Sequence, residues 1–265
     1  MIGTVIDLHA HILAGLDDGP PNLDASAEMA AAAVADGVRV MAATSHVNRG
    51  FALRAWELAA ARADVMERLA ADGIELELVQ GGEISMSRLG TLEDDELEQL
   101  TLGRSRWLLL ECPLSPGAPP MDAAVADLRT RGFEVLLAHP ERSPAFMREP
   151  VALERVQAMG ALAQVTSGSF AGEFGDTVRH AAFAMLERGL VHVMASDAHS
   201  ARHRPPALHN ALASFEKRYD DAEEQFDWMA SAVPRALLDG APLPERPDLP
   251  RARRGGLLRR LTRGG

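Results

Sequence analysis

Short apolar runs alternate with helical segments along most of this 265-residue chain, and this alternation constrains the fold more than any other feature. Helices are expected between the strands, and most of them are followed by glycine, the usual stop signal of a helix. Strands that alternate with helices pair in parallel through βαβ units, so we expect an α/β protein. The predicted strands are residues 4–8, 38–44, 74–80, 106–110, 133–138, 161–165 and 190–195. The predicted helices are residues 24–36, 54–72, 92–101, 121–131, 150–159 and 176–188.

The C-terminal region departs from this rhythm. Residues 206–232 are predicted to form terminal helices, whereas residues 240–265 contain several prolines followed by a cluster of arginines. A segment of that composition has too few apolar side chains to build a packed core. We therefore expect a single barrel domain over residues 1–238 and a mobile Pro/Arg-rich tail over residues 239–265.

Composition excludes several classes of function. The formal net charge is −11, and the chain without its basic C-terminus is still more acidic, which argues against nucleic acid as a ligand. A single cysteine, Cys112, excludes an internal disulfide and a zinc site built from several thiolates. No apolar stretch is long enough to cross a membrane, and the N-terminus lacks an export signal. We therefore expect a cytoplasmic protein that is not embedded in a membrane.

Histidine and acidic residues recur where the predicted strands end. A lone His-x-His motif such as His9-Ala10-His11 fits two surface histidines near a turn about as well as it fits a metal site. Here, however, the signal recurs at the ends of many strands, and the carboxyl ends of parallel strands form the face on which barrel enzymes build their sites. The pattern therefore predicts a metal enzyme. The candidate ligands are His9, His11, Asp18, His46, Glu83, Glu111, His139, Asp197 and His199.

Seven segments together span nearly all of residues 1–235: DLHAHILAGLDDGP (7–20), ATSH (43–46), GGEIS (81–85), LLLEC (108–112), LLAHPER (136–142), QVTSGSFAGEFG (164–175) and ASDAHSARHRPP (195–206). In these segments and in their order, the chain resembles the PHP (polymerase and histidinol phosphatase) superfamily. The segments DDGP, AHPER and the arginine-proline end of the last one are similar to bacterial metal-dependent tyrosine-protein phosphatases of capsular and exopolysaccharide synthesis. The resemblance implies a distorted seven-stranded (β/α) TIM-like barrel, the PHP fold.

The resemblance also implies roles for individual residues. His9, His11, Glu83 and Asp197 would bind a first divalent metal ion. Glu83 would bridge to a second ion, held also by Glu111 and His139, and Asp18, His46 and His199 would hold a third. Arg142 and Arg204 would bind the phosphoryl group of the substrate. The ions are expected to be manganese, although this mixed His/Asp/Glu ligation is also compatible with iron, magnesium or zinc.

The implied activity is hydrolysis of phosphotyrosine on a protein, with a bacterial tyrosine kinase of polysaccharide export as the expected partner. One alternative keeps the fold and the metals but acts on a small phosphoester such as histidinol phosphate. A second alternative is a regulatory module that keeps metal ions only for stability. The complete set of ligands and two arginines argues against that module, because a structural site needs no open coordination position.

Two further features allow two interpretations each. Ser167-Gly168-Ser169, between a strand and a helix, fits either an anion-binding turn or a simple reversal of the chain. His203 lies between two arginines in a loop that is expected to border the site. The other histidines, His180, His192 and His209, fall inside predicted elements, where packed or solvated roles are expected.

Overall fold

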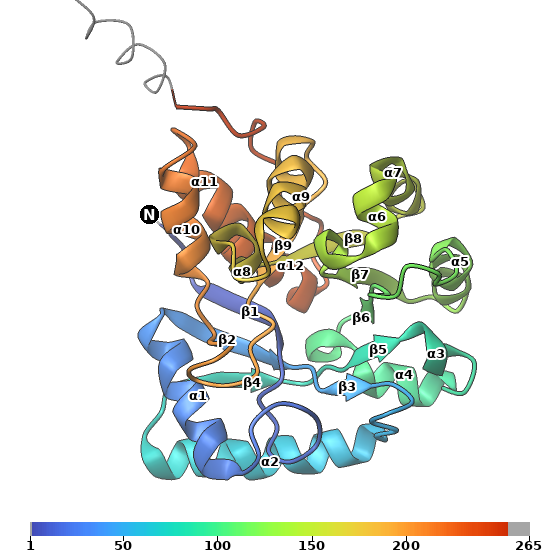
Figure 1. The fold of residues 1–265 in the computed structure, drawn as a ribbon. Coiled ribbons are helices and arrows are strands. Elements are labelled where there is room, and N and C mark those ends of the chain that lie inside the picture. Colours follow the sequence, from blue (N-terminus) through green and yellow to red (C-terminus); the bar gives the residue numbers. More distant parts are fainter. Residues whose placement is uncertain (1, 254–265) are drawn as a thin grey trace, which may run out of the picture.

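The computed structural model describes residues 2–253, with parallel strands at the centre and helices around them (Figure 1). The pairings between named strands are all parallel. The strands are β1 (Val5–Ala10), β2 (Val38–Ala43), β3 (His46–Val47), β4 (Glu77–Val79), β5 (Glu83–Ser85), β6 (Trp107–Glu111), β7 (Glu134–Ala138), β8 (Leu162–Thr166) and β9 (Val193–Ala195).

Two interruptions turn seven barrel positions into nine strands. The second position is broken at residues 44–45 between β2 and β3, and the third is broken at residues 80–82 between β4 and β5. One sheet has the order β1-β2-β4 and the other the order β3-β5-β6-β7-β8-β9, so both broken strands cross from one sheet to the other. Glycine is needed at the second break, since a Cβ on Gly81 would lie 2.9 Å from Thr44 Cγ2.

Backbone hydrogen bonds join the last barrel position to the first. The Asp197 N–H donates to the His9 carbonyl and the His11 N–H donates to the Ala198 carbonyl, both at 2.8 Å. Ala10 and Ala198 are bridged in parallel. The sheets therefore close into a distorted seven-stranded α/β barrel, and the predicted fold class is confirmed.

The helices surround the strands, and the expected terminal helices divide into shorter segments (Figure 1). Three short turns are η1 (Leu102–Arg104) and η2 (Pro140–Arg142), which are 3₁₀ turns, and η3 (Trp228–Ala232), a π-helical turn. The helices are α1 (Leu23–Ala35), α2 (Ala55–Asp72), α3 (Met86–Leu89), α4 (Asp94–Leu100), α5 (Asp122–Thr130), α6 (Pro144–Arg148), α7 (Pro150–Ala158), α8 (Ser167–Ala171), α9 (Asp176–Glu187), α10 (His209–Glu216), α11 (Ala222–Asp227) and α12 (Val233–Asp239).

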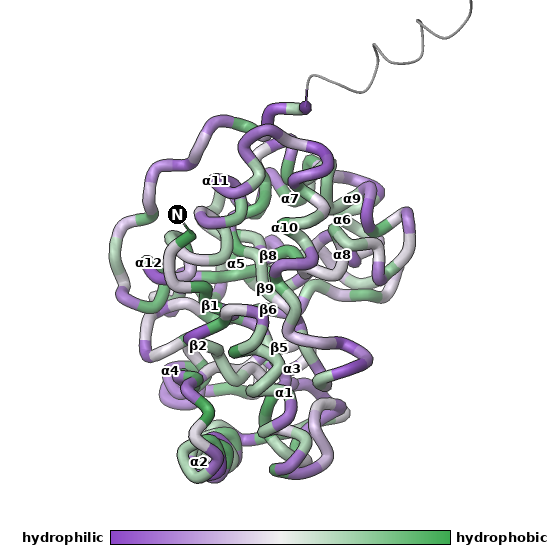
Figure 2. The backbone as a smooth tube through the Cα atoms, turned by 90° about the vertical axis from the view of Figure 1, so that its left-hand side faces the viewer, coloured by the Kyte–Doolittle hydropathy of each residue, from purple (hydrophilic) through white to green (hydrophobic). Residues whose placement is uncertain are grey.

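The core follows the strands, whose tube is mainly hydrophobic in Figure 2, whereas the peripheral α4 is mainly hydrophilic. Three consecutive leucines of β6, Leu108 to Leu110, are fully buried, as expected for a parallel strand covered on both faces. A second cluster lies under α8, α9 and α10, where the ring of Phe170 packs edge-on against Phe183 and Phe215 at centroid distances of 5.2 and 4.8 Å. Because α8 directly follows β8, this cluster fixes the segment that borders the strand ends.

The first part of the expected mobile tail makes ordered contacts with the barrel. Gln225 Nε2 donates to the Asp248 carbonyl at 2.7 Å, and the Arg246 guanidinium lies 4.2 Å from the centroid of the Trp228 ring. Tyr219 and Ala252 form an antiparallel bridge. Residues 240–253 are thus attached to α10, α11 and η3, while the arginine-rich residues 254–265 of the expected tail lie outside the described residues. None of the helices within residues 2–253 combines the length and apolar character of a membrane span.

Candidate metal centre

The nine candidate ligands gather at the carboxyl ends of the barrel strands. The strand breaks alter two local placements: Glu83 is the first residue of β5, and His46 is the first residue of β3. His9 lies inside β1, one residue before the strand ends, whereas the sequence had placed it after the strand. The nine residues fall into four groups of neighbouring ligand atoms: His11, Asp18, His46 and His199; His9, His11 and Glu83; His9, His139 and Asp197; and His46, Glu83 and Glu111.

Two histidine nitrogens lie close to each other and to two carboxylate oxygens. His9 Nε2 and His11 Nε2 are 3.3 Å apart, and each lies 3.3–3.5 Å from Glu83 Oε2 and 3.5 Å from Asp197 Oδ1. Neighbouring ligand atoms about 3.4 Å apart are compatible with metal–nitrogen and metal–oxygen bonds of about 2.1 Å. The geometry at these four buried residues therefore fits a divalent ion.

Hydrogen bonds on the far side of each ring orient the first two histidines. His9 Nδ1 lies 2.9 Å from Gln164 Oε1, and His11 Nδ1 lies 2.8 Å from Asp17 Oδ2. Because both acceptors take the Nδ1 proton, the Nε2 lone pairs are directed at the metal position. The sequence reasoning missed these roles of Asp17 and Gln164. For Asp17 a signal existed, since it precedes Asp18 in the same acidic motif.

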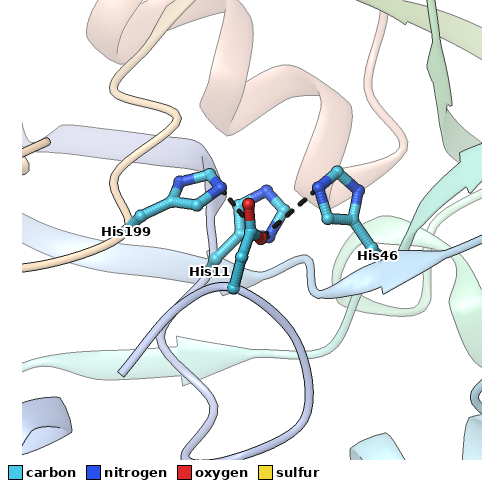
Figure 3. A group of neighbouring side chains, drawn as sticks. His11, His46 and His199 are labelled. Atoms are coloured by element: carbon cyan, nitrogen blue, oxygen red, sulfur yellow. Dashed lines mark ion pairs between the residues drawn. The ribbon is translucent and has the colours of Figure 1, made fainter. Parts of the chain in front are cut away.

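A second grouping lies beside the first and shares His11 with it. Figure 3 shows His199, His11 and His46 arriving from three different segments of the chain. Asp18 Oδ1 lies 3.2 Å from His199 Nε2 and 3.5 Å from His46 Nε2. The Nδ1 atom of His199 is 2.9 Å from the Asp197 carbonyl oxygen, which again leaves Nε2 for a metal. The side chain of Asp18 is about half exposed, so this position opens toward solvent.

The remaining ligands extend the cluster around Glu83. Its Oε1 atom lies 2.9 Å from His139 Nε2, and its Oε2 atom lies 2.8 Å from His46 Nδ1. Glu111 ends β6 and shares a ligand group with Glu83 and His46. One carboxylate thus contacts histidines from several strands, the arrangement expected of a residue that bridges two metal ions.

Electrostatics at the cluster keeps two carboxylates ionised and the His199 imidazole neutral, whereas Glu83 and neighbouring aspartates outweigh burial and raise the pKa of His9 and of His11. Burial opposes ionisation of Glu83, but His9, His11, His139 and His46 hold its pKa well below the usual range. For Asp197 too, burial is outweighed by His9, His139 and Arg204, which lower the pKa. Burial and the nearby His11 lower the pKa of His199 to about 4. Ionised carboxylates and a neutral imidazole are the ligand forms that bind metal ions.

One carboxylate departs from this pattern. Burial and the negative charge of Glu83 raise the pKa of Glu111. Two carboxylates that share a site disfavour each other's ionised form, and a cation between them removes that repulsion. The raised pKa of Glu111 is therefore also consistent with a cation bound between Glu111 and Glu83.

Backbone strain coincides with two of the ligands. His139 has φ = 39° and Asp197 has φ = 51°, both in the left-handed region that side chains other than glycine rarely adopt. Aspartate and histidine adopt this conformation more often than other residues with a side chain, but it is still less favourable for them than for glycine. Strained residues of this kind concentrate at functional sites, where the surrounding structure holds them in place.

Both arginines converge on the ligand Asp197. Arg142 Nη1 donates to Asp197 Oδ2 at 2.6 Å, and Arg204 Nη2 lies 2.5 Å from the same oxygen. The other carboxylate oxygen, Oδ1, faces His9 and His11. Asp197 therefore separates the metal position from two guanidinium groups that remain partly accessible to solvent.

Several buried atoms at the site have no hydrogen-bond partner among residues 2–253. They include Glu83 Oε2, His199 Nε2 and the Arg204 Nε donor. An unpaired buried polar group is destabilising, so such atoms need an explanation. Metal ions at Glu83 and His199, and an anion at Arg204, would account for all three.

The residues that allowed two interpretations lie next to this centre. Ser167 to Ser169 form the first turns of the short α8, and Ser169 Oγ donates to the buried Glu141 Oε1 at 2.7 Å. His203 lines a pocket of about 450 Å³ together with Asp18 and His199. The serine segment is therefore tied to the core, while His203 lies at an opening beside the metal groups.

Comparisons with known proteins agree with this geometry. The family described as "Capsular polysaccharide synthesis, CpsB/CapC" matches residues 5–238. The tyrosine-protein phosphatase YwqE of Bacillus subtilis is 33% identical over 255 residues, covering 94% of this chain and 98% of YwqE. The tyrosine-protein phosphatase CpsB of Streptococcus pneumoniae is 30% identical over 223 residues, covering 81% of this chain and 91% of CpsB.

A solved structure supports the same relationship. It comes from work on YwqE from Bacillus subtilis and CpsB from Streptococcus pneumoniae, characterised as unique metal-dependent tyrosine phosphatases. Its chain superposes with a TM-score of 0.82 at 31% identity, covering 94% of this chain and all of the other. From the matched family, the relatives and the shared structure, this chain belongs to the CpsB/CapC family of capsular polysaccharide synthesis.

Proposed function

We propose that this chain is a metal-dependent phosphatase that hydrolyses phosphotyrosine on proteins. The observation that carries the proposal is the meeting of Arg142 and Arg204 at Asp197, directly beside the cluster of ligand atoms. A phosphoryl group placed there would contact the metal ions on one side and two guanidinium groups on the other. Tyrosine-protein phosphatases among the relatives supply the substrate class.

The proposed site holds three divalent ions, with manganese as the expected metal. His9, His11, Glu83 and Asp197 would hold the first, Glu83, Glu111 and His139 the second, and Asp18, His46 and His199 the third. The short distances from His9 and His11 to Glu83 Oε2 and Asp197 Oδ1 support the first position. Bound there, the ions would supply positive charge for the phosphoryl oxygens and bring the pKa of water close to neutrality.

The chain's own side chains would orient the phosphoryl group. An arginine fork can donate two parallel hydrogen bonds to phosphoryl oxygens, and Arg204 Nε is a buried donor without a partner among the described residues. Asp197 holds both guanidinium groups at the edge of the site before substrate arrives. A tyrosine leaving group has a pKa of ~10, so it needs less help from a general acid than a serine alkoxide does.

We further propose that the substrate is a phosphotyrosine-bearing protein of polysaccharide synthesis, such as a bacterial tyrosine kinase of polysaccharide export. The CpsB/CapC family assignment supports this class of partner. The acidic chain would repel a polyanion such as nucleic acid, whereas a single phosphoryl group meets the local positive charge of arginines and metal ions.

A substrate panel tests the proposal. The protein loaded with manganese is assayed with a phosphotyrosine peptide, the same peptide carrying phosphoserine, and histidinol phosphate. We expect the phosphotyrosine peptide to give the highest kcat/KM. A preference for histidinol phosphate would replace the proposed substrate by a small phosphoester, and no turnover of any of the three would reject phosphatase activity. Elemental analysis of the same sample counts the bound ions.

A further inference from the structure

A short loop between α8 and α9 carries an aromatic ring into contact with the arginine pair. The loop consists of residues 172–175 and is bounded by Gly172 and Gly175, whose φ angles are +91° and +87°. The Glu173 N–H donates to the Gly168 carbonyl at 2.9 Å, and the Gly175 N–H donates to the Gly172 carbonyl at 3.1 Å. Two positive-φ glycines and two backbone hydrogen bonds therefore define the position of Phe174.

A third glycine leaves space for this loop. A Cβ on Gly168 would lie 2.4 Å from Glu173 Oε2 and 3.4 Å from Phe174 Cε2. Gly168 itself is buried in α8, the helix that the Phe170 cluster holds against the barrel. The edge of the Phe174 ring therefore packs against a rigid helix, and its face is free to meet another group.

That face meets the two arginines. The Arg142 Cζ atom lies 4.4 Å from the ring centroid of Phe174, and the Arg204 Cζ atom lies 6.0 Å from it. Both distances are within the range of a cation–π interaction, in which the negative face of the ring attracts a guanidinium group. Two like charges held at one carboxylate oxygen repel each other, so a second attractive surface helps to keep them together.

We propose that Phe174 is a positioning residue that aligns Arg142 and Arg204 for the phosphoryl group. Attraction to the negative face of the ring does not use up the guanidinium N–H groups, which stay available for phosphoryl oxygens. When phosphate competes with Asp197 for these donors, the contact with the ring therefore persists. This inference rests on the proposed phosphatase function, but it concerns phosphate binding and can be measured without turnover.

A second arginine–aromatic pair in the same protein provides a matched control. Arg218 Cζ lies 4.5 Å from the ring centroid of Phe183, nearly the distance found at Phe174. Phe183 belongs to the core cluster with Phe170 and Phe215 and is only 3% exposed, whereas Phe174 is half-buried. Phe183→Leu therefore tests the loss of an aromatic ring from the fold, and Phe174→Leu tests the loss of a ring from the arginine pair.

The experiment measures inorganic phosphate binding to the manganese-loaded protein by calorimetry, with Tm recorded for each variant. We expect Phe174→Leu to weaken phosphate binding about three- to tenfold, the range of a partly exposed cation–π contact. Phe174→Tyr, which keeps the aromatic face, should bind phosphate as the wild type does. Phe183→Leu should lower Tm more than Phe174→Leu does and leave phosphate affinity unchanged.

Two results would overturn the proposal. One is wild-type phosphate affinity in Phe174→Leu, and the other is an equal loss of affinity in Phe174→Leu and Phe174→Tyr, since tyrosine keeps the aromatic face and its failure would show that phosphate binding does not depend on that face. Hydrolysis of a phosphotyrosine peptide separates this proposal from the function on which it rests. If the wild type binds phosphate with the expected variant pattern but hydrolyses no phosphotyrosine, the positioning role stands and the proposed activity fails.

Discussion

Histidine has opposite roles at the two ends of the barrel strands. At the carboxyl end, His9 Nε2 lies 3.5 Å from a glutamate and an aspartate, with ligand atoms nearby that have no partner in the described chain. At the amino end, His192 directly precedes β9, and its Nδ1 accepts a hydrogen bond from the Ala163 N–H at 3.4 Å. Burial and the positive charge of Arg246 lower the pKa of His192 to about 4, so this ring is neutral.

This comparison distinguishes polar groups whose partners would come from a ligand, at the carboxyl end, from polar groups whose partners come from the chain itself, at the amino end. The amino end is covered by η3, whose Trp228 lies beside His192, and the chain itself supplies the partners. At the carboxyl end several buried polar atoms have no hydrogen-bond partner among the described residues, as is expected where a cation or an anion would complete the site. In barrel proteins, function is concentrated at the carboxyl end and stability at the amino end.

The sharpest test of this contrast replaces one residue at each end. Asp197→Asn removes a ligand charge and the shared acceptor of both arginines, while asparagine still tolerates the left-handed backbone. We expect kcat toward a phosphotyrosine peptide to fall about a thousandfold or more, with the fold retained by circular dichroism. His192→Gln should keep kcat within about twofold of the wild type, because it lies outside any ligand group. Comparable losses in both variants would erase the distinction between the two ends.

A smaller loss is expected when the arginine fork alone is changed. Arg204→Ala should lower kcat/KM roughly ten- to a hundredfold, since a charged hydrogen bond is worth about 1.5–3 kcal/mol. Arg204→Lys should not rescue this loss, because lysine keeps the charge without the planar pair of donors. Metal content should stay constant in both variants. The contact is to phosphate, so aryl phosphates and phosphopeptides should lose equally; unchanged kcat/KM for both would place Arg204 outside the site.

Metal binding should also appear as thermal stability. With manganese at about a hundred times its Kd, one site adds about 2.7 kcal/mol to the free energy of unfolding, which is roughly 5–10 °C in Tm for a domain of this size. Chelation should remove this increment together with activity. His192→Gln should keep the shift in full and Asp197→Asn should lose much of it. If neither manganese nor the chelator changed the Tm, the carboxyl end would hold no ion.

The smallest effect concerns pH at the amino end. His192 has a folded pKa of about 4, below its usual 6.5, so the unfolded chain binds a proton that the folded chain does not. The contribution of the neutral His192 ring to the free energy of unfolding is therefore complete above pH 6.5. This contribution is lost as the pH falls from 6.5 toward 4. Between pH 7 and pH 5 the wild type should lose about 1–2 kcal/mol more than His192→Gln. The free energy of unfolding is measured with urea for both proteins at both pH values. An equal change between pH 7 and pH 5 in the two proteins would contradict this prediction.

Much of the site was predictable because parallel strands bring their ends together. Once the strands were located, His46, Glu83 and His139 had to share one face of the barrel, whatever their distance in sequence. The strand breaks at residues 44–45 and 80–82 could not be foreseen, since each depends on a sheet-to-sheet crossing that apolar periodicity does not encode. The partners of the ligands were also hidden. Gln164 and Phe174 act through side-chain contacts that depend on the folded positions of distant segments.

The contacts of the first residues of the predicted tail were hidden for a related reason. Prolines at the start of residues 240–265 indicated a segment with no packing partner. Within residues 240–253, however, the Arg246 guanidinium contacts the Trp228 ring of η3, and the Asp248 carbonyl accepts a hydrogen bond from Gln225 of α11. An extended segment can be ordered by a few side-chain and carbonyl contacts without having an apolar pattern of its own. Amino-acid composition indicates whether a segment can form a core of its own. It does not indicate whether a few contacts hold the segment against another part of the protein.

The left-handed backbone at His139 bears on how this protein would respond to selection. Glycine adopts φ = 39° without strain, so His139→Gly relieves the backbone while it deletes a ligand from the cluster. A variant library selected for heat resistance in the presence of chelator should therefore enrich glycine at position 139, and the same library selected for growth dependent on phosphatase activity should eliminate it. Selection for stability and selection for catalysis would therefore favour different residues at position 139.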